Sequence, residues 1–124
     1  MNYELKDFNR IMERVNEVRI VAGDHEEGFT YDMATMSYRD SGYAVAYHDT
    51  QDSFGVLGLV KAVAHAYNNG NEVVGGWYNK ENEQFYFDSI RIFPSTDLQG
   101  AIEFGRHQKQ IAIFNLDTME EIRL

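Results

Sequence analysis

The tightest grouping of side chains that could perform chemistry is His48, Asp49 and Asp52. An imidazole beside two carboxylates can hold a divalent metal ion or activate a water molecule as a general base. These residues follow a predicted strand and precede a predicted helix, where aspartate is common because its side chain caps free backbone amides. The spacing therefore allows a small hydrolase or nucleotide-modifying enzyme, although helix capping is the simpler interpretation.

The other histidines, at positions 25, 65 and 107, follow no recognisable catalytic or metal-binding spacing. His25 lies in the contiguous run DHEE at 24–27, which favours a solvated acidic loop. His65 follows Lys61 by one helical turn, which predicts an exposed position. Because the chain has no cysteine, thiolate metal sites and disulfides are excluded. We expect no cofactor and no bound metal.

The net charge of -9 is distributed unevenly along the 124 residues. Residues 1–20 are neutral, whereas residues 21–60 carry seven acidic side chains and a single arginine, Arg39. Such a field repels nucleic-acid phosphates and anionic lipid, and it attracts basic protein surfaces. We therefore expect a protein-binding surface formed by Asp24, Glu26, Glu27, Asp32, Asp40, Asp49 and Asp52.

The spacing of apolar residues predicts the elements that must position these side chains. Helices are expected over residues 3–20, from Asp52 or Ser53 to about 67, and over 98–105. Strands are expected over 29–40, 43–48, 73–78, 85–93, 111–114 and 121–124. The first two strands should form a hairpin around the turn RDSG at 39–42. A bulge or a close backbone approach is expected at Gly75-Gly76, and a bulge is expected near Asp88 or Ser89, where the alternation slips.

This order predicts an α+β fold in which an amphipathic N-terminal helix precedes an antiparallel or mixed sheet with two helices on one face. From residue 42 the order is β-α-β-β-α-β, as in a ferredoxin-like split unit. We expect one domain over 1–124, composed of the helix at 1–23, an acidic loop and hairpin at 24–50 and an αββαβ unit at 51–124. The sequence has no signal peptide or membrane span, which favours the cytoplasm.

The segments SGYAV, GGW, FYFD and QIAIFNL, with the terminal EEIRL, resemble a small domain of phage, plasmid and conjugative-element proteins. The resemblance covers about residues 41–124, and it implies a mobile genetic element of a gut bacterium. Small acidic proteins in that setting often resemble inhibitors of host restriction or CRISPR nucleases. The resemblance assigns no catalytic residue to this chain.

These observations favour a non-enzymatic, acidic protein-binding module of a mobile element. The most specific version of this hypothesis is that the chain mimics nucleic acid and inhibits a host defence nuclease. The expected partner is a basic protein surface, such as that of a nucleic-acid-binding host protein, with no direct contact to nucleic acid or membrane. Two alternatives stay open. One is an enzyme that uses His48 with Asp49 or Asp52, and the other is a homodimer or larger assembly.

Overall fold

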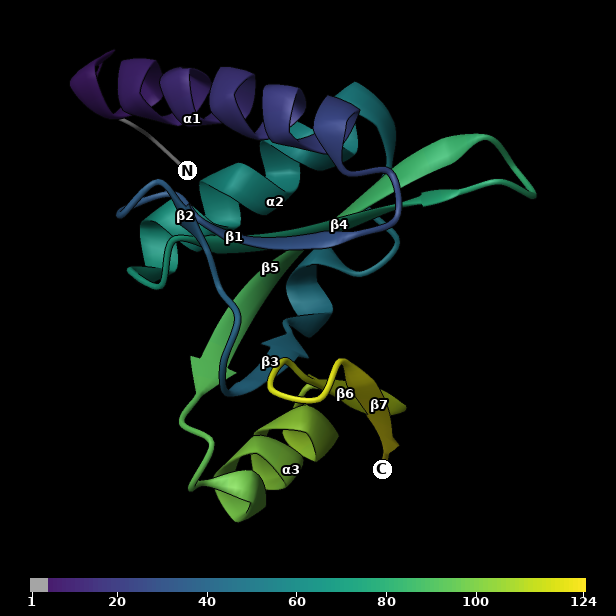
Figure 1. The fold of residues 1–124 in the computed structure, drawn as a ribbon. Coiled ribbons are helices and arrows are strands. Elements are labelled where there is room, and N and C mark those ends of the chain that lie inside the picture. The colour runs from purple at the N-terminus through teal and green to yellow at the C-terminus, as the bar shows by residue number, and fades with distance from the viewer. Residues whose placement is uncertain (1–4) are drawn as a thin grey trace.

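The computed structural model describes residues 5–124, with side chains from Asp7 onward (Figure 1). The helices are α1 (Leu5–Asp24), α2 (Gly55–Asn69) and α3 (Leu98–His107), with a short 3-10 helix, η1 (His48–Thr50). The strands are β1 (Phe29–Asp32), β2 (Ser37–Tyr38), β3 (Tyr43–Ala46), β4 (Val73–Asn79), β5 (Gln84–Phe93), β6 (Ala112–Asn115) and β7 (Glu120–Arg123). The predicted α+β class is confirmed. The predicted start of the first helix at Tyr3 lies outside the described residues.

All seven strands form one antiparallel sheet in the order β2-β1-β4-β5-β3-β6-β7. The middle four strands, with α2 and α3 as connections, have the neighbour order of a ferredoxin-like split unit. β1 and β2 extend this unit at one edge, and β7 extends it at the other. The long strand β5 runs from the part of the molecule that contains α1 and α2 to the part that contains α3 (Figure 1), and it therefore joins them.

The helices cover one face of the sheet. On α1, Ile11, Val15 and Val18 lie on one stripe and are buried in a cluster with residues of α2, β1, β4 and β5, as expected for an amphipathic helix. A second buried cluster, around Val45 and Ala101, holds α3 against β3, β5 and β6. Since α1 packs within its own chain, its apolar stripe belongs to the core. No described helix is both long and apolar enough to cross a membrane.

The opposite face of the sheet carries the side chains that alternate with these core positions. Along β5, the odd-numbered residues from Phe85 to Phe93 face the helices, and the even-numbered residues face away. A small apolar cluster, formed by strand residues and Leu116, lines this second face. In the described part of the chain no helix packs on it. It is therefore the uncovered face of the sheet.

The predicted pairing of the first two strands was wrong. β1 pairs with β2 and β4, whereas β3 pairs with β5 and β6 on the other side of the sheet. Two local features separate them. The carboxylate of Asp32 accepts hydrogen bonds from the amides of Ala34 and Thr35 and closes an earlier turn. Gly42 has a φ of 90°, and a Cβ there would lie 2.4 Å from the carbonyl oxygen of Phe93, so the chain passes closely over β5.

The predicted bulges were also wrong, because the register of β4 and β5 is continuous from Val73 opposite Ile90 to Asn79 opposite Gln84. Gly76 is required for space, since a Cβ there would lie 2.7 Å from the ring of Phe29. Side chains along β5 alternate between the two faces without interruption, and only the polarity of one residue departs from the pattern. Ser89 faces the helices because it has hydrogen-bond partners there.

Candidate functional site

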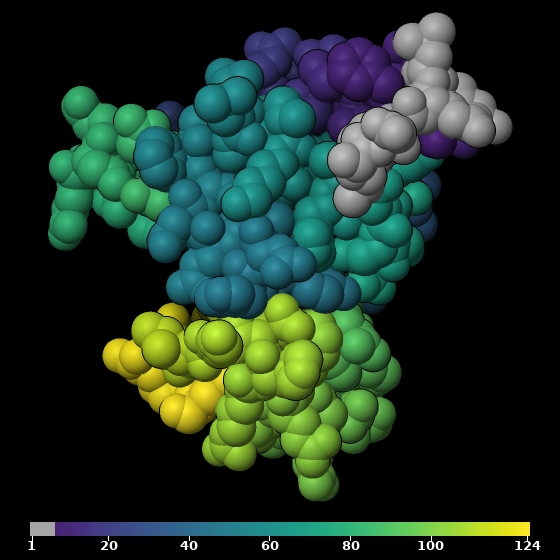
Figure 2. Space-filling view, turned by 180° about the vertical axis from the view of Figure 1, so that it is seen from behind, coloured from purple at the N-terminus to yellow at the C-terminus, as the bar shows by residue number. Residues whose placement is uncertain are grey.

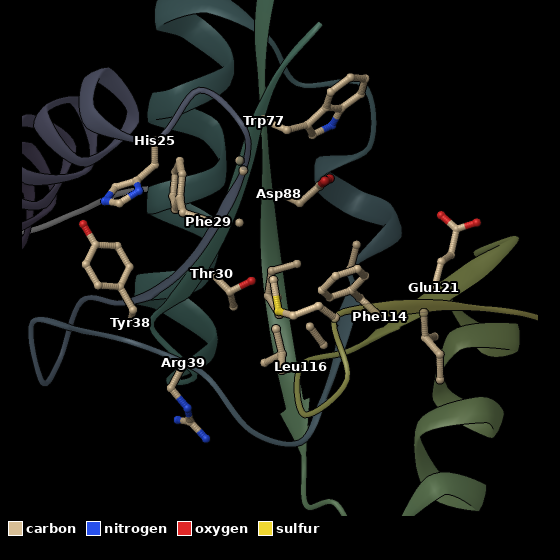
Figure 3. Close-up of a pocket in the computed structure, with 18 of the residues that line it drawn as sticks. His25, Phe29, Thr30, Tyr38, Arg39, Trp77, Asp88, Phe114, Leu116 and Glu121 are labelled. Atoms are coloured by element: carbon tan, nitrogen blue, oxygen red, sulfur yellow. The ribbon is translucent and has the colours of Figure 1, made fainter.

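The uncovered face of the sheet forms a groove of about 690 Å³ between the β1–β2 hairpin and the β6–β7 hairpin. Figure 3 shows β5 along its middle, with Tyr38 and Arg39 on one side and Phe114 and Glu121 on the other. Seen from the helix-covered side, the tip of the β4–β5 hairpin stands out from the rest of the molecule, and a gap separates it from the C-terminal strands (Figure 2). The floor of the groove is apolar, with Ala44, Ala46, Ile90, Phe114 and Leu116 among its residues.

Acidic side chains surround this apolar floor. Glu27, Asp40, Asp88 and Glu121 line the groove, against the single guanidinium of Arg39. Arg39 is itself paired, with Nη1 lying 3.2 Å from Oδ2 of Asp32. The groove therefore combines apolar contact area with an excess of negative charge, and both favour a ligand that is basic and partly apolar.

Asp88 is the most unusual of these acids. It lies on the central strand β5 and is only partly exposed, and its side chain forms no hydrogen bond or ion pair with any other described residue. Burial raises the pKa of its carboxyl to about 6, and the negative charge of Asp52 adds to this effect. A carboxylate that loses water without gaining a partner is costly, so Asp88 is the group in the groove that gains most from a cation.

Exposed aromatic rings adjoin Asp88. Trp77 is 47% exposed and lines the groove. Its indole stacks on Tyr86 at 5.5 Å, and Tyr86 contacts Phe54 at 5.6 Å between ring centroids. Exposed aromatic groups that line a groove are typical of protein-binding surfaces.

The predicted acidic surface does not form one patch. Glu27 and Asp40 line the groove, and Asp52 lies close enough to Asp88 to affect its pKa. Asp32 is buried in the β1–β2 turn, where it holds the backbone and Arg39. The remaining predicted residues lie at the end of α1, in the loop after it and in η1: Asp24, Glu26 and Asp49.

The predicted catalytic trio of His48, Asp49 and Asp52 is not assembled. His48 Nδ1 lies 3.2 Å from Oε1 of Gln51, and within residues 7–124 its ring contacts neither carboxylate. Asp49 instead approaches His65, with 3.4 Å between Oδ2 and Nε2. The same residues contain no group of three or more histidine or acidic side chains that could hold a metal ion. Helix capping does not explain the aspartates either, because the N-cap of α2 is Phe54.

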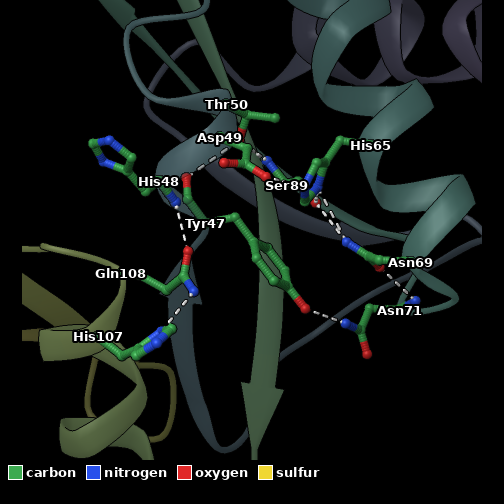
Figure 4. A network of polar contacts seen from close by, with 10 residues as sticks. All are labelled: Tyr47, His48, Asp49, Thr50, His65, Asn69, Asn71, Ser89, His107 and Gln108. Carbon is green, nitrogen blue, oxygen red and sulfur yellow. Dashed lines mark hydrogen bonds and ion pairs between the residues drawn. The ribbon is translucent and has the colours of Figure 1, made fainter. Parts of the chain in front are cut away.

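A serine, a histidine and an aspartate do meet elsewhere, on the helix-covered face (Figure 4). His65 Nδ1 lies 2.9 Å from Oγ of Ser89, while its Nε2 approaches Asp49. The side chain of His65 is only 23% exposed, so the prediction of an exposed residue was wrong. Ser89 is 0% exposed, whereas a catalytic serine must reach its substrate. This arrangement therefore holds η1, α2 and β5 together and does not form an active site.

Sequence reasoning missed the groove because its residues come from strands far apart in the chain. The usable signal was Asp88, an acidic residue within the aromatic strand FYFDSIRIF, next to the tandem glycines of β4. Compared with protein family models, curated proteins and solved structures, the chain matches none of them.

Proposed function

We propose that this chain is a protein-binding module that holds a basic segment of a partner protein in the groove on its uncovered sheet face. The observation that carries the proposal is an apolar groove of about 690 Å³ bordered by four carboxylates and one guanidinium, which is already paired. Long-range attraction to the net charge of -9 would speed the encounter. Contact with the apolar floor and the exposed rings would then supply most of the affinity.

Neighbouring residues on β7 provide a matched test. Glu121 is opposite Phe114 and lines the groove, whereas Glu120 is opposite Asn115 and points to the other face. Both side chains are exposed, and Glu121→Lys and Glu120→Lys change the net charge by the same amount. Only the first places a positive charge in the groove.

The experiment selects peptides from a random displayed library on the wild-type chain at low salt. We expect the selected peptides to combine arginine or lysine with apolar residues. Glu121→Lys should weaken their binding about 3- to 10-fold, because an exposed charge pair contributes up to about 1 kcal/mol and reversal makes it repulsive. Glu120→Lys should leave the affinity unchanged. Selection of neutral or acidic peptides, or equal losses in the two variants, would contradict the proposal.

The class of partner is proposed as a nucleic-acid-binding host protein, in particular a restriction or CRISPR nuclease. Support comes from the acidity of the chain, since such proteins present basic clefts to the phosphate backbone, and from the resemblance over residues 41–124 to mobile-element proteins. We expect the purified chain to slow DNA cleavage by such a nuclease, and Glu121→Lys to slow it less than Glu120→Lys does. Unchanged cleavage across a panel of restriction and CRISPR nucleases would remove this class of partner.

A further inference from the structure

One part of the groove has a glycine at its centre, between two side chains with oxygen atoms. Gly75 on β4 lies opposite Thr30 of β1 on one side and Asp88 of β5 on the other. Residues that pair across neighbouring strands point to the same face, so Thr30 and Asp88 flank a position that has no side chain of its own. The Ile90 side chain borders this position, since a Cβ on Gly75 would lie 3.3 Å from its Cγ1. Trp77, two residues further along β4, borders the same space, and all of these residues line the groove. We call this space the Gly75 notch.

The chemistry of the notch suits a cation. Asp88 and Thr30 supply oxygen acceptors, and among the described residues neither side chain has a hydrogen-bond partner. Trp77 presents an indole with one face stacked on Tyr86, and an indole is the aromatic group that attracts cations best. Figure 3 shows Trp77 and Asp88 extending to the same side of β5.

We propose that the Gly75 notch is a subsite for an arginine side chain of the partner segment, whose guanidinium pairs with the Asp88 carboxylate and contacts the Trp77 indole. This inference rests on the proposed function and names the residue that the groove selects. Arginine fits better than lysine because a guanidinium is planar, stacks on aromatic rings and is more weakly hydrated than an ammonium group. A weakly hydrated cation loses less on entering a site where the carboxylate is already desolvated.

The raised pKa of Asp88, about 6, makes this binding depend on pH. Only the ionised carboxylate attracts the guanidinium, so the affinity should fall about tenfold between pH 7.5 and pH 5. Other titratable and charged groups lie around Asp88, and these must be separated from it by mutation: Asp52 from the segment before α2, and His25, Glu27, Arg39, Asp40 and Glu121 along the groove.

The test uses N-acetyl-arginine methylamide as the probe, with the lysine analogue and the uncharged citrulline analogue for comparison. Trp77 is the single tryptophan of the chain, so its fluorescence reports on the notch, and the amide shift of Gly75 in NMR spectra gives a second signal. We expect millimolar binding of the arginine probe, weaker binding of the lysine probe and at least tenfold weaker binding of the citrulline probe.

Three variants complete the test. Asp88→Asn should weaken binding of the arginine probe at least tenfold and abolish its pH dependence. Gly75→Ala should also weaken it, because the added methyl group, 3.3 Å from Cγ1 of Ile90, narrows the space between Thr30 and Asp88. His25→Gln should leave the pH dependence in place, because the proposal assigns that dependence to the Asp88 carboxyl. Equal binding of the arginine and citrulline probes, or wild-type affinity in Asp88→Asn, would overturn the proposal.

Binding of the peptide selected on the groove distinguishes a failure of the arginine subsite from a failure of the proposed function. If peptide binding responds to Glu121→Lys but not to Asp88→Asn, the groove holds a basic segment and the arginine subsite is wrong. If both variants weaken it, and replacing one peptide arginine by lysine removes the effect of Asp88→Asn, the subsite is supported. If the wild-type chain selects no basic peptide, the proposed function is wrong, and the probe titration alone then decides whether the notch binds a guanidinium.

Discussion

Asp88 and Ser89 are neighbours on β5 that point to opposite faces of the same sheet, and their surroundings differ completely. Ser89 faces the helices and is 0% exposed. Its hydroxyl contacts His65, and its backbone amide donates to the hydroxyl of Thr50 at 2.9 Å. Asp88 faces the groove, where burial has raised its pKa and no described residue provides a hydrogen bond or an opposite charge.

The difference separates a structural polar group from a functional candidate. A buried group whose hydrogen bonds are satisfied within the chain stabilises the fold and leaves nothing for a ligand. A desolvated group without a partner costs stability, and such groups concentrate at sites where a ligand supplies what is missing. By this criterion the serine, histidine and aspartate on the covered face are structural, although their residue types suggest catalysis.

The largest effect that tests this comparison is expected on the covered face. Thr50→Val should lower the free energy of unfolding by about 2 kcal/mol, because the isosteric side chain leaves the buried amide of Ser89 without an acceptor. Urea denaturation at pH 7 measures this loss. Peptide binding in the groove should be unchanged, since Thr50 is fully buried and does not line the groove.

Asp49→Asn is the matched control at the adjacent position. The side chain of Asp49 is 76% exposed, and exposed ion pairs contribute little. Its removal should change the free energy of unfolding by less than about 0.5 kcal/mol. If the two variants were equally destabilising, the polar contacts of η1 would form a single cooperative unit. Burial would then not explain which of these contacts stabilise the fold.

Most of the fold could be predicted from the sequence because local patterns determine it. The stripe of Ile11, Val15 and Val18 indicated α1. Pro94 and a helix cap at Ser95, Thr96 or Asp97 indicated the start of α3, and of these three Asp97 accepts a hydrogen bond from the amide of Gly100. The order of elements from residue 42 predicted the split unit. Strand pairing was the weak point, because residues 29–40 contain both β1 and β2, and nothing in their periodicity reveals the turn that Asp32 closes.

The groove could not be predicted for a different physical reason. Its floor and rim come from strands that become neighbours only through the topology of the sheet, and their alternating pattern was read as a bulge near Asp88. The acidic surface was predicted from charge density along the chain, which ignores where each carboxylate points. Asp32 shows the consequence, because its charge is used by Arg39 and two backbone amides. Glu121, by contrast, lines the groove from outside the acidic segment.

A smaller effect, opposite in sign, is expected on the uncovered face. Asp88→Asn should stabilise the chain by about 1 kcal/mol at pH 8. A pKa raised from 3.8 to about 6 corresponds to at most about 3 kcal/mol of destabilisation by the ionised form, and a buried amide retains about 1–2 kcal/mol of this cost. The folded state holds the proton more tightly than the unfolded state, so wild-type stability should fall as the pH rises from about 4 to about 6 and then remain low.

Thermal melting of both proteins from pH 4 to pH 8 distinguishes this mechanism from a simple packing change. The difference in Tm between Asp88→Asn and wild type should be smallest at pH 4 and should grow through pH 6, because only the wild-type group acquires a charge over that range. A difference independent of pH would mean that the carboxyl is well solvated in the groove. It would then gain little from a cation, and the contrast between the two faces of β5 would lose its physical basis.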